Sequence, residues 1–441
     1  MRCDGILNRK KRKGQPRMKT PEKHQQKIAF IALLVMLLAG GTGYFMYLKM
    51  PVFIIMLLVL TGSVAIGLHV HETQENEFHM INCFGGQPGR GRIKEYDLIR
   101  ITATILVIAT HTIDAGIAEE NNEVFRYTLV SLSTVTRCCN YLFVMLSGAL
   151  LLEYREEKLS HFYFRRFSRV IIPMIIYYTF YLWMNRSSFF PGTSFLQICN
   201  RMLTGNTVPE APHFHLMYTI LSLYISFPFM RYLLKAMPYR RLTMMVIIIL
   251  GFLGLKLFVP QLGVSTFLTG WIGIAVLGYW VTREETGKYH TALIILGVVH
   301  VGITFYVCAV YDDCVSIVYD RSPIMSFVSL GIMAVVYKLR RKKTEISWGM
   351  RFINRYSYPI ILVHWWALYW ITIAHFHIDA TDWYGLGLIV STLVTLIVSA
   401  FAAFAADNLF VLPVQKALDA CFHAISVRRC LKRQETSKTA G

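Results

Sequence analysis

Residues 96–117 read YDLIRITATILVIATHTIDAGI, an apolar stretch that also carries Arg100, His111 and Asp114. A helix rises about 1.5 Å per residue and needs about 20 residues to cross the hydrocarbon core of a bilayer. The stretch therefore predicts a membrane-spanning helix. Because ionisable side chains are costly inside a membrane, these three residues are candidates for a functional role.

The composition of the whole chain agrees with a membrane protein. Of its 441 residues, 55% are hydrophobic and 16% are charged, whereas soluble domains have about 25% charged residues. The formal net charge is +19, but the basic residues gather between apolar runs. That distribution is typical of membrane topology, so nucleic acid is not expected as a partner.

Further apolar runs of spanning length occur along the chain. They predict an all-α, polytopic transmembrane helix bundle of about 12 spans, with two N-terminal helices before a core of about ten. The predicted spans lie at residues 28–48, 52–69, 96–117, 128–152, 170–184, 214–234, 242–259, 264–281, 291–310, 323–337, 357–374 and 384–413.

Basic residues alternate between the loops on the two sides of these spans. Predicted inner segments hold clusters such as Arg165, Arg166 and Arg169, while predicted outer segments hold few basic residues. Because cytoplasmic loops are enriched in Lys and Arg, both termini are expected in the cytoplasm. The predicted regions are a basic cytoplasmic N-terminus (1–27), two extra transmembrane helices (28–69), a cytoplasmic linker (70–94), a transmembrane core (95–413) and a cytoplasmic tail (414–441).

Arg100 and His111 are eleven residues apart, about 20° more than three helical turns, so they share one helix face about 16 Å apart. A histidine that apolar surroundings keep neutral can accept a proton from an alcohol. Asp114, three residues on, can reach the ring and fix its tautomer, or it can face water at the outer side. Arg100 can hold an anionic group, or it can simply extend to the interface.

Five short motifs, in order, carry a resemblance to a known family. They are Asp97-x-x-Arg100 with His111, Phe143-Val-Met-Leu-Ser147-Gly148, Phe164-Arg165-Arg166-x-x-Arg169 up to Pro173, His215-Leu-Met-Tyr218, and Ser357-Tyr358 up to His364. Together they resemble acyltransferase family 3, a family of bacterial integral-membrane acyltransferases, over residues 94–413. The chain departs from the family pattern at Ala149, Met217 and Ile361, which bears on the fit of the substrate.

The resemblance implies an O-acyltransferase that moves an acetyl or other acyl group from cytoplasmic acyl-CoA to a hydroxyl of an extracytoplasmic or lipid-linked glycan. Such a protein is expected to be a multi-pass protein of the bacterial cytoplasmic (inner) membrane. The resemblance is to the stand-alone type, which has no SGNH hydrolase-like domain. Acyl-CoA is expected as the donor substrate, with no further cofactor.

The resemblance also implies roles for individual residues. The residues expected to be catalytic are His111 and Arg100, together with Asp114, which is added because of its spacing from His111. Those expected to bind acyl-CoA are Arg165, Arg166 and Arg169. Those expected to line or support the passage are Asp97, Ser147, His215, Tyr218, Ser357 and His364. Whether His111 acts as a general base or carries the acyl group stays open.

A second class of function also stays open, namely a transporter or a ligand-binding module without acyl transfer. About 12 spans is a common transporter number, but the sequence has no evident internal two-fold repeat. The pairs His213-Phe-His215 and His375-Phe-His377 lie near the predicted outer face. Alternate residues on a helix point apart, so no metal site is expected there.

Overall fold

A computed structural model describes residues 94–154, 157–185, 192, 194–204, 211–259, 270–319, 322–339 and 347–421 of the chain. The predicted helices at 28–48 and 52–69, and the predicted linker up to residue 93, lie outside these residues. The chain divides into two compact units. The first comprises Met1–Ile81, Ile171–Thr204 and Ala405–Gly441, and the second comprises Asn82–Val170 and Gly205–Phe404.

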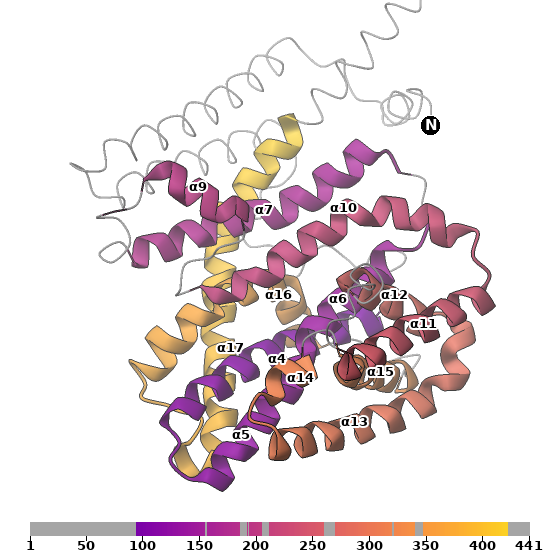
Figure 1. Ribbon diagram of the computed structural model, residues 1–441. Coiled ribbons are helices and arrows are strands. Elements are labelled where there is room, and N and C mark those ends of the chain that lie inside the picture. The colour runs from indigo at the N-terminus through magenta and orange to yellow at the C-terminus, as the bar shows by residue number, and fades with distance from the viewer. Residues whose placement is uncertain are drawn as a thin grey trace, which may run out of the picture. The chain divides into compact units, whose positions relative to one another are not determined.

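Every regular element in the described part of the chain is a helix (Figure 1). The second unit holds α4 (Lys94–Glu119), α5 (Glu123–Thr136), α6 (Cys138–Leu151), the start of α7 (Leu159–Met184), η3 (Pro212–Phe214), α10 (His215–Lys235), α11 (Tyr239–Phe258), α12 (Trp271–Val281), η5 (Glu284–Tyr289), α13 (His290–Val310), α14 (Cys314–Tyr319), α15 (Pro323–Lys338), α16 (Trp348–Trp366), η6 (Ala367–Ile373), η7 (Asp382–Gly385) and most of α17 (Leu386–Ala406). The first unit holds the rest of α7, α9 (Phe195–Thr204) and η8 (Asp407–Val411).

Several of these helices have the length and composition of membrane spans. Among the described residues, six are long and apolar enough, and two shorter apolar helices, α12 and α15, accompany them. The six are Lys94–Glu119, Glu123–Leu151, Leu159–Met184, Tyr239–Phe258, Glu284–Val310 and Leu386–Cys421. The fold is therefore an all-helical polytopic bundle, as the sequence predicts, while the number of about 12 spans stays a prediction.

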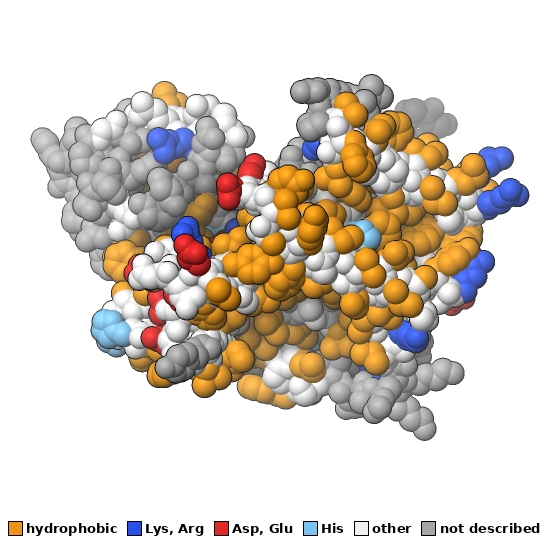
Figure 2. Space-filling model, turned by 60° about the horizontal axis from the view of Figure 1, so that its bottom comes forward, with side chains coloured by type: hydrophobic (Ala, Val, Ile, Leu, Met, Phe, Trp, Pro, Cys, Tyr) orange, Lys and Arg blue, Asp and Glu red, His pale blue; other side chains and the backbone are white. Residues whose placement is uncertain are grey.

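The outward sides of α11 and α13 suit contact with lipid. In each of these helices only 22% of the apolar stretch is buried inside the protein, so residues such as Ile247 and Val298 point outward. Figure 2 shows hydrophobic side chains over much of one face of the molecule. Soluble proteins rarely expose so large an apolar surface, which agrees with a bilayer as the surrounding solvent.

The core of the second unit is built around a close crossing of α6 and α12. Gly148 of α6 lies against the backbone of Ala275, and Gly278 of α12 lies against the backbone of Met145. A Cβ atom at either glycine would overlap that backbone. Small residues let membrane helices approach closely enough for extensive van der Waals contact, which is the main attraction between helices in lipid.

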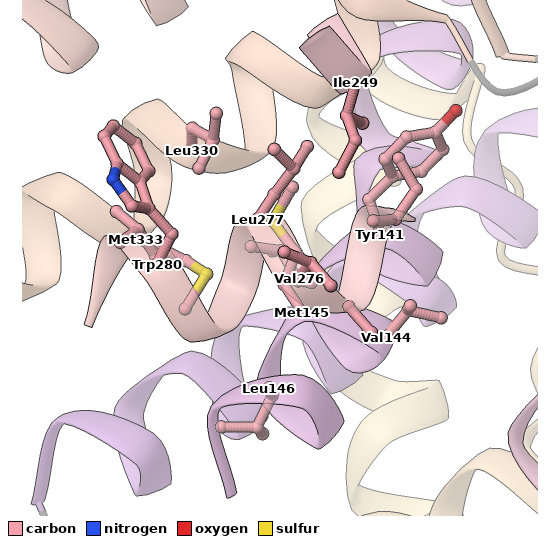
Figure 3. Close-up of a cluster of buried hydrophobic side chains, with 14 of the residues drawn as sticks. Tyr141, Val144, Met145, Leu146, Ile249, Val276, Leu277, Trp280, Leu330 and Met333 are labelled. Carbon is pink, nitrogen blue, oxygen red and sulfur yellow. The ribbon is translucent and has the colours of Figure 1, made fainter. Parts of the chain in front are cut away.

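Large apolar side chains fill the space around this crossing (Figure 3). Those contributed by four helices are Tyr141, Val144, Met145 and Leu146 of α6, Ile249 of α11, Val276, Leu277 and Trp280 of α12, and Leu330 and Met333 of α15. Their dense packing gives α6 a fixed position, and α4 packs directly against α6. The candidate site on α4 is therefore supported by a rigid framework.

Candidate active site

Helices α4 and α16 pack against each other and carry the two ends of the candidate site. At one end, Arg100 Nη1 donates a hydrogen bond to Asn354 Oδ1 at 3.0 Å. At the other, the rings of His111 and His364 are stacked with centroids 5.2 Å apart. Both Arg100 and His111 therefore face α16. The earlier residue of α4 contacts the earlier residue of α16, and the later contacts the later, so the two helices run in the same direction.

The Arg100 end, which is cytoplasmic in the predicted topology, is a buried polar network. Asn354 Nδ2 donates to Asp97 Oδ1 at 2.7 Å, and Arg100 Nη1 lies 3.9 Å from the same carboxylate oxygen. Asp97 and Asn354 are buried, whereas the Arg100 side chain is 30% exposed. Asp97 and Asn354 thus hold the guanidinium from one side, and part of its surface remains open to an anionic ligand.

Further arginines lie close to this end. Arg165 and Arg166 of α7 lie 4.0 and 3.5 Å from Glu157, so this carboxylate partly balances their charge. The Tyr224 hydroxyl on α10 lies next to Ser147 and within electrostatic reach of Arg100, Arg166 and Arg169. Tyr224, which the sequence analysis did not identify, therefore lies within electrostatic reach of arginines from two different motifs.

The other end of the site is a cluster of imidazole and indole rings. His111 of α4 contacts His364 and, at 5.0 Å between ring centroids, Trp365 of α16. His213 of η3 lies 4.9 Å from His364 and 5.7 Å from Trp365. His111, His213 and His364 are far apart in the sequence, and the fold brings them together. Sequence reasoning assigned neither His213 nor Trp365 to the site.

Hydrogen bonds fix the tautomer of His364. Its Nδ1 lies 2.6 Å from the carbonyl oxygen of Ile361, and because a carbonyl can only accept, Nδ1 must carry the proton. The other nitrogen, Nε2, is buried and has no hydrogen-bond partner among the described residues. His364 therefore presents a lone pair inside the ring cluster.

The imidazole of His111 is positioned by ring contacts. Within the described part of the chain it makes no hydrogen bond, and its side chain is 20% exposed. Its Nδ1 lies 3.8 Å from Asp114 Oδ2, which is longer than a hydrogen bond. A ring held in this way keeps a nitrogen lone pair for a substrate, either to accept a proton or to attack a carbonyl.

Asp114 binds a different partner. Arg137 Nη2 donates to both of its oxygens, at 3.1 and 2.9 Å, and the Ser133 hydroxyl donates to Oδ1. Arg137 lies at the junction between α5 and α6, where the predicted span 128–152 is interrupted. Sequence reasoning missed Arg137, although a charged residue inside an apolar run was a sufficient signal.

The remaining predicted residues make mostly local contacts. The Ser147 and Ser357 hydroxyls donate to the backbone oxygens of Phe143 and Asn354. His215 is exposed and its Nδ1 donates to the Pro212 carbonyl at 2.9 Å, while the Tyr218 hydroxyl oxygen is buried. In the described ranges no group of three or more His, Cys, Asp or Glu side chains is suited to a metal ion.

The chain matches a known protein family over most of its length. The family model described as the acyltransferase domain, that of acyltransferase family 3, matches residues 93–402. No curated protein and no solved structure matches the chain. The matched region contains all five motifs and both ends of the site. The chain belongs to acyltransferase family 3 and is a membrane acyltransferase of that family.

Proposed function

We propose that the protein transfers an acetyl or other acyl group from cytoplasmic acyl-CoA to a hydroxyl of an extracytoplasmic or lipid-linked glycan. The observation that carries this proposal is the arrangement of α4 and α16. One face holds a partly open guanidinium, Arg100, at one end. About 16 Å further along it holds His111, an imidazole that makes no hydrogen bond to the described residues. An anionic donor and a hydroxyl acceptor need these two kinds of group.

The basic end suits the donor. Acyl-CoA carries phosphate groups, and arginine binds phosphate through charge-assisted, often bidentate hydrogen bonds. Arg166 and Arg169 lie near Arg100 around the Tyr224 hydroxyl, and Arg165 lies beside Arg166 on α7. The phosphates bound there would leave the pantetheine arm to extend along the face shared by Arg100 and His111.

The imidazole end suits the chemistry of transfer. As a general base, His111 accepts the proton of the acceptor hydroxyl while the hydroxyl oxygen bonds to the thioester carbonyl carbon. The carbon–sulfur bond then breaks and the proton passes to the CoA sulfur. As a nucleophile, His111 instead takes the acyl group onto a ring nitrogen, releases CoA, and passes the group to the hydroxyl in a second step.

The test uses the purified full-length protein with radiolabelled acetyl-CoA and a bacterial glycolipid extract. Release of CoA and labelling of the glycolipid are expected for the wild type, and both are expected to be lost in His111→Ala and Arg100→Ala. The matched control is His300→Ala on α13, because His300 packs against Phe327 outside the site. A wild-type protein that neither binds nor cleaves acetyl-CoA would rule out the proposed donor and favour a transporter or ligand-binding module.

A further inference from the structure

The ion pair of Asp114 and Arg137 lies beside His111, and no step described above uses it. Both Asp114 oxygens accept from Arg137, and Ser133 donates to one of them. The nearer oxygen stops 3.8 Å from His111 Nδ1. A carboxylate in this position would be expected to accept a hydrogen bond from the imidazole. That it accepts hydrogen bonds from Arg137 instead requires an explanation.

We infer that Arg137 is a positioning residue that holds Asp114 away from His111 and balances its charge, so that the imidazole keeps a lone pair for the substrate. An unpaired carboxylate within about 4–6 Å favours the protonated imidazole by about one to three powers of ten. A protonated ring can neither accept the proton of a hydroxyl nor attack a thioester. With Arg137 in place, rings rather than a carboxylate orient His111.

The local structure explains how Arg137 reaches this position. It follows the last residue of α5 and precedes the first residue of α6, and its backbone N–H still bonds to the Ser133 carbonyl. The junction therefore places Ser133 and Arg137 on the same side, toward α4. The charged or titratable groups around the His111–Asp114 pair are Arg137, His213, His215, His364 and Tyr369. A second described carboxylate, Asp379, packs against Gly116, two residues further along α4.

The test measures the imidazole directly, with diethyl pyrocarbonate as the probe. This reagent transfers an ethoxycarbonyl group to an unprotonated histidine nitrogen, and mass spectrometry of the His111 peptide gives the rate. In the full-length protein, Arg137→Gln is expected to raise the pH at which this reaction reaches half its maximal rate by about one to three units, because the freed Asp114 then stabilises the protonated ring. The rate should recover as the pH is raised.

The double variant Arg137→Gln/Asp114→Asn decides between a charge effect and a structural one. It has no unpaired carboxylate, so its His111 is expected to react at nearly the wild-type rate. The control is Arg126→Gln, an exposed arginine of α5, which should change nothing. An unchanged pH profile in Arg137→Gln overturns the inference, and so does a double variant with the same profile as the single one.

The inference rests on the proposed function only in that the His111 lone pair is used for acyl transfer. The experiments can therefore contradict the proposed function and the role of Arg137 independently. A wild-type protein whose His111 reacts as expected but which does not turn over acetyl-CoA contradicts the proposed function alone. For an active protein, kcat of acyl transfer should fall in Arg137→Gln and recover in the double variant. KM for acetyl-CoA should stay unchanged in both, because Arg137 lies at the imidazole end.

Discussion

The two ends of the face between α4 and α16 are built on opposite principles. At the Arg100 end, the guanidinium and the Asp97 carboxylate are joined through Asn354 by hydrogen bonds of 3.0 and 2.7 Å. At the His111 end, the imidazole touches other rings, and within the described residues it makes no hydrogen bond. A charged group inside a membrane protein must be stabilised in place, whereas a reacting group must keep its lone pair.

This difference separates the effects expected from mutations. At the Arg100 end, a side chain contributes both to the fold and to donor binding, so its loss should affect both. At the His111 end, the reacting ring contributes little to the fold, so its loss should affect the reaction almost alone. The following variants test that separation.

The largest effect is expected for His111→Ala. Removing a general base costs about 10²- to 10⁴-fold in rate, and we expect a fall of that size in kcat for acyl transfer. The melting temperature in detergent should change little, because the ring makes no hydrogen bond to the described residues. A large fall in melting temperature, with kcat above one tenth of the wild-type value, would show that His111 supports the fold rather than the reaction.

An intermediate effect is expected for Asn354→Leu, which keeps the volume but removes both polar contacts. A hydrogen bond to a charged group contributes about 1.5–3 kcal/mol of stabilisation. About 1.4 kcal/mol of binding free energy corresponds to a tenfold change in affinity. KM for acetyl-CoA should therefore rise about 10- to 100-fold, with a lower melting temperature because Asp97 loses its buried donor. Steady-state kinetics check this. A fall in kcat at constant KM would instead place Asn354 in the chemistry.

The smallest effect is expected for Trp365→Leu, which removes one of the two rings against His111. Aromatic pairs contribute about 0.5–1.5 kcal/mol beyond the area they bury, which corresponds to roughly 3- to 10-fold in kcat. Trp370→Leu is the matched control, because Trp370 lies in the following η6 and is largely exposed. Equal kinetics for the two variants would show that ring contact does not orient His111.

The sequence predicted the parts of the site that depend on one helix. Arg100 and His111 lie on one face because of their spacing, and this needs no knowledge of other helices. The family motifs brought in His364, Ser147 and the α7 arginines, and the family itself is confirmed. Their roles in binding and catalysis remain predictions.

The parts that depend on pairs of distant helices could not be predicted in the same way. Asn354 pairs with a residue 254 positions away, and its partner follows only from the packing of α16 on α4. His213 lies in a short 3-10 helix, and its contact with His364 follows only from the packing of that helix against α16. Arg137 differs from both, because its charge within the run 128–152 was visible, and only its partner required the fold.

The hydrogen bond between Arg100 and Asn354 also has a consequence for how the protein is made. At about 5–20 residues per second, α16 leaves the ribosome roughly 10–50 s after α4. During that interval α4, with Asp97 and Arg100, is already in or at the membrane, but the hydrogen bonds with Asn354 have not yet formed. Asp97 and Arg100 are three residues apart and 3.9 Å from each other, so they can pair at once. Asp97 can therefore balance the charge of Arg100 before Asn354 is available.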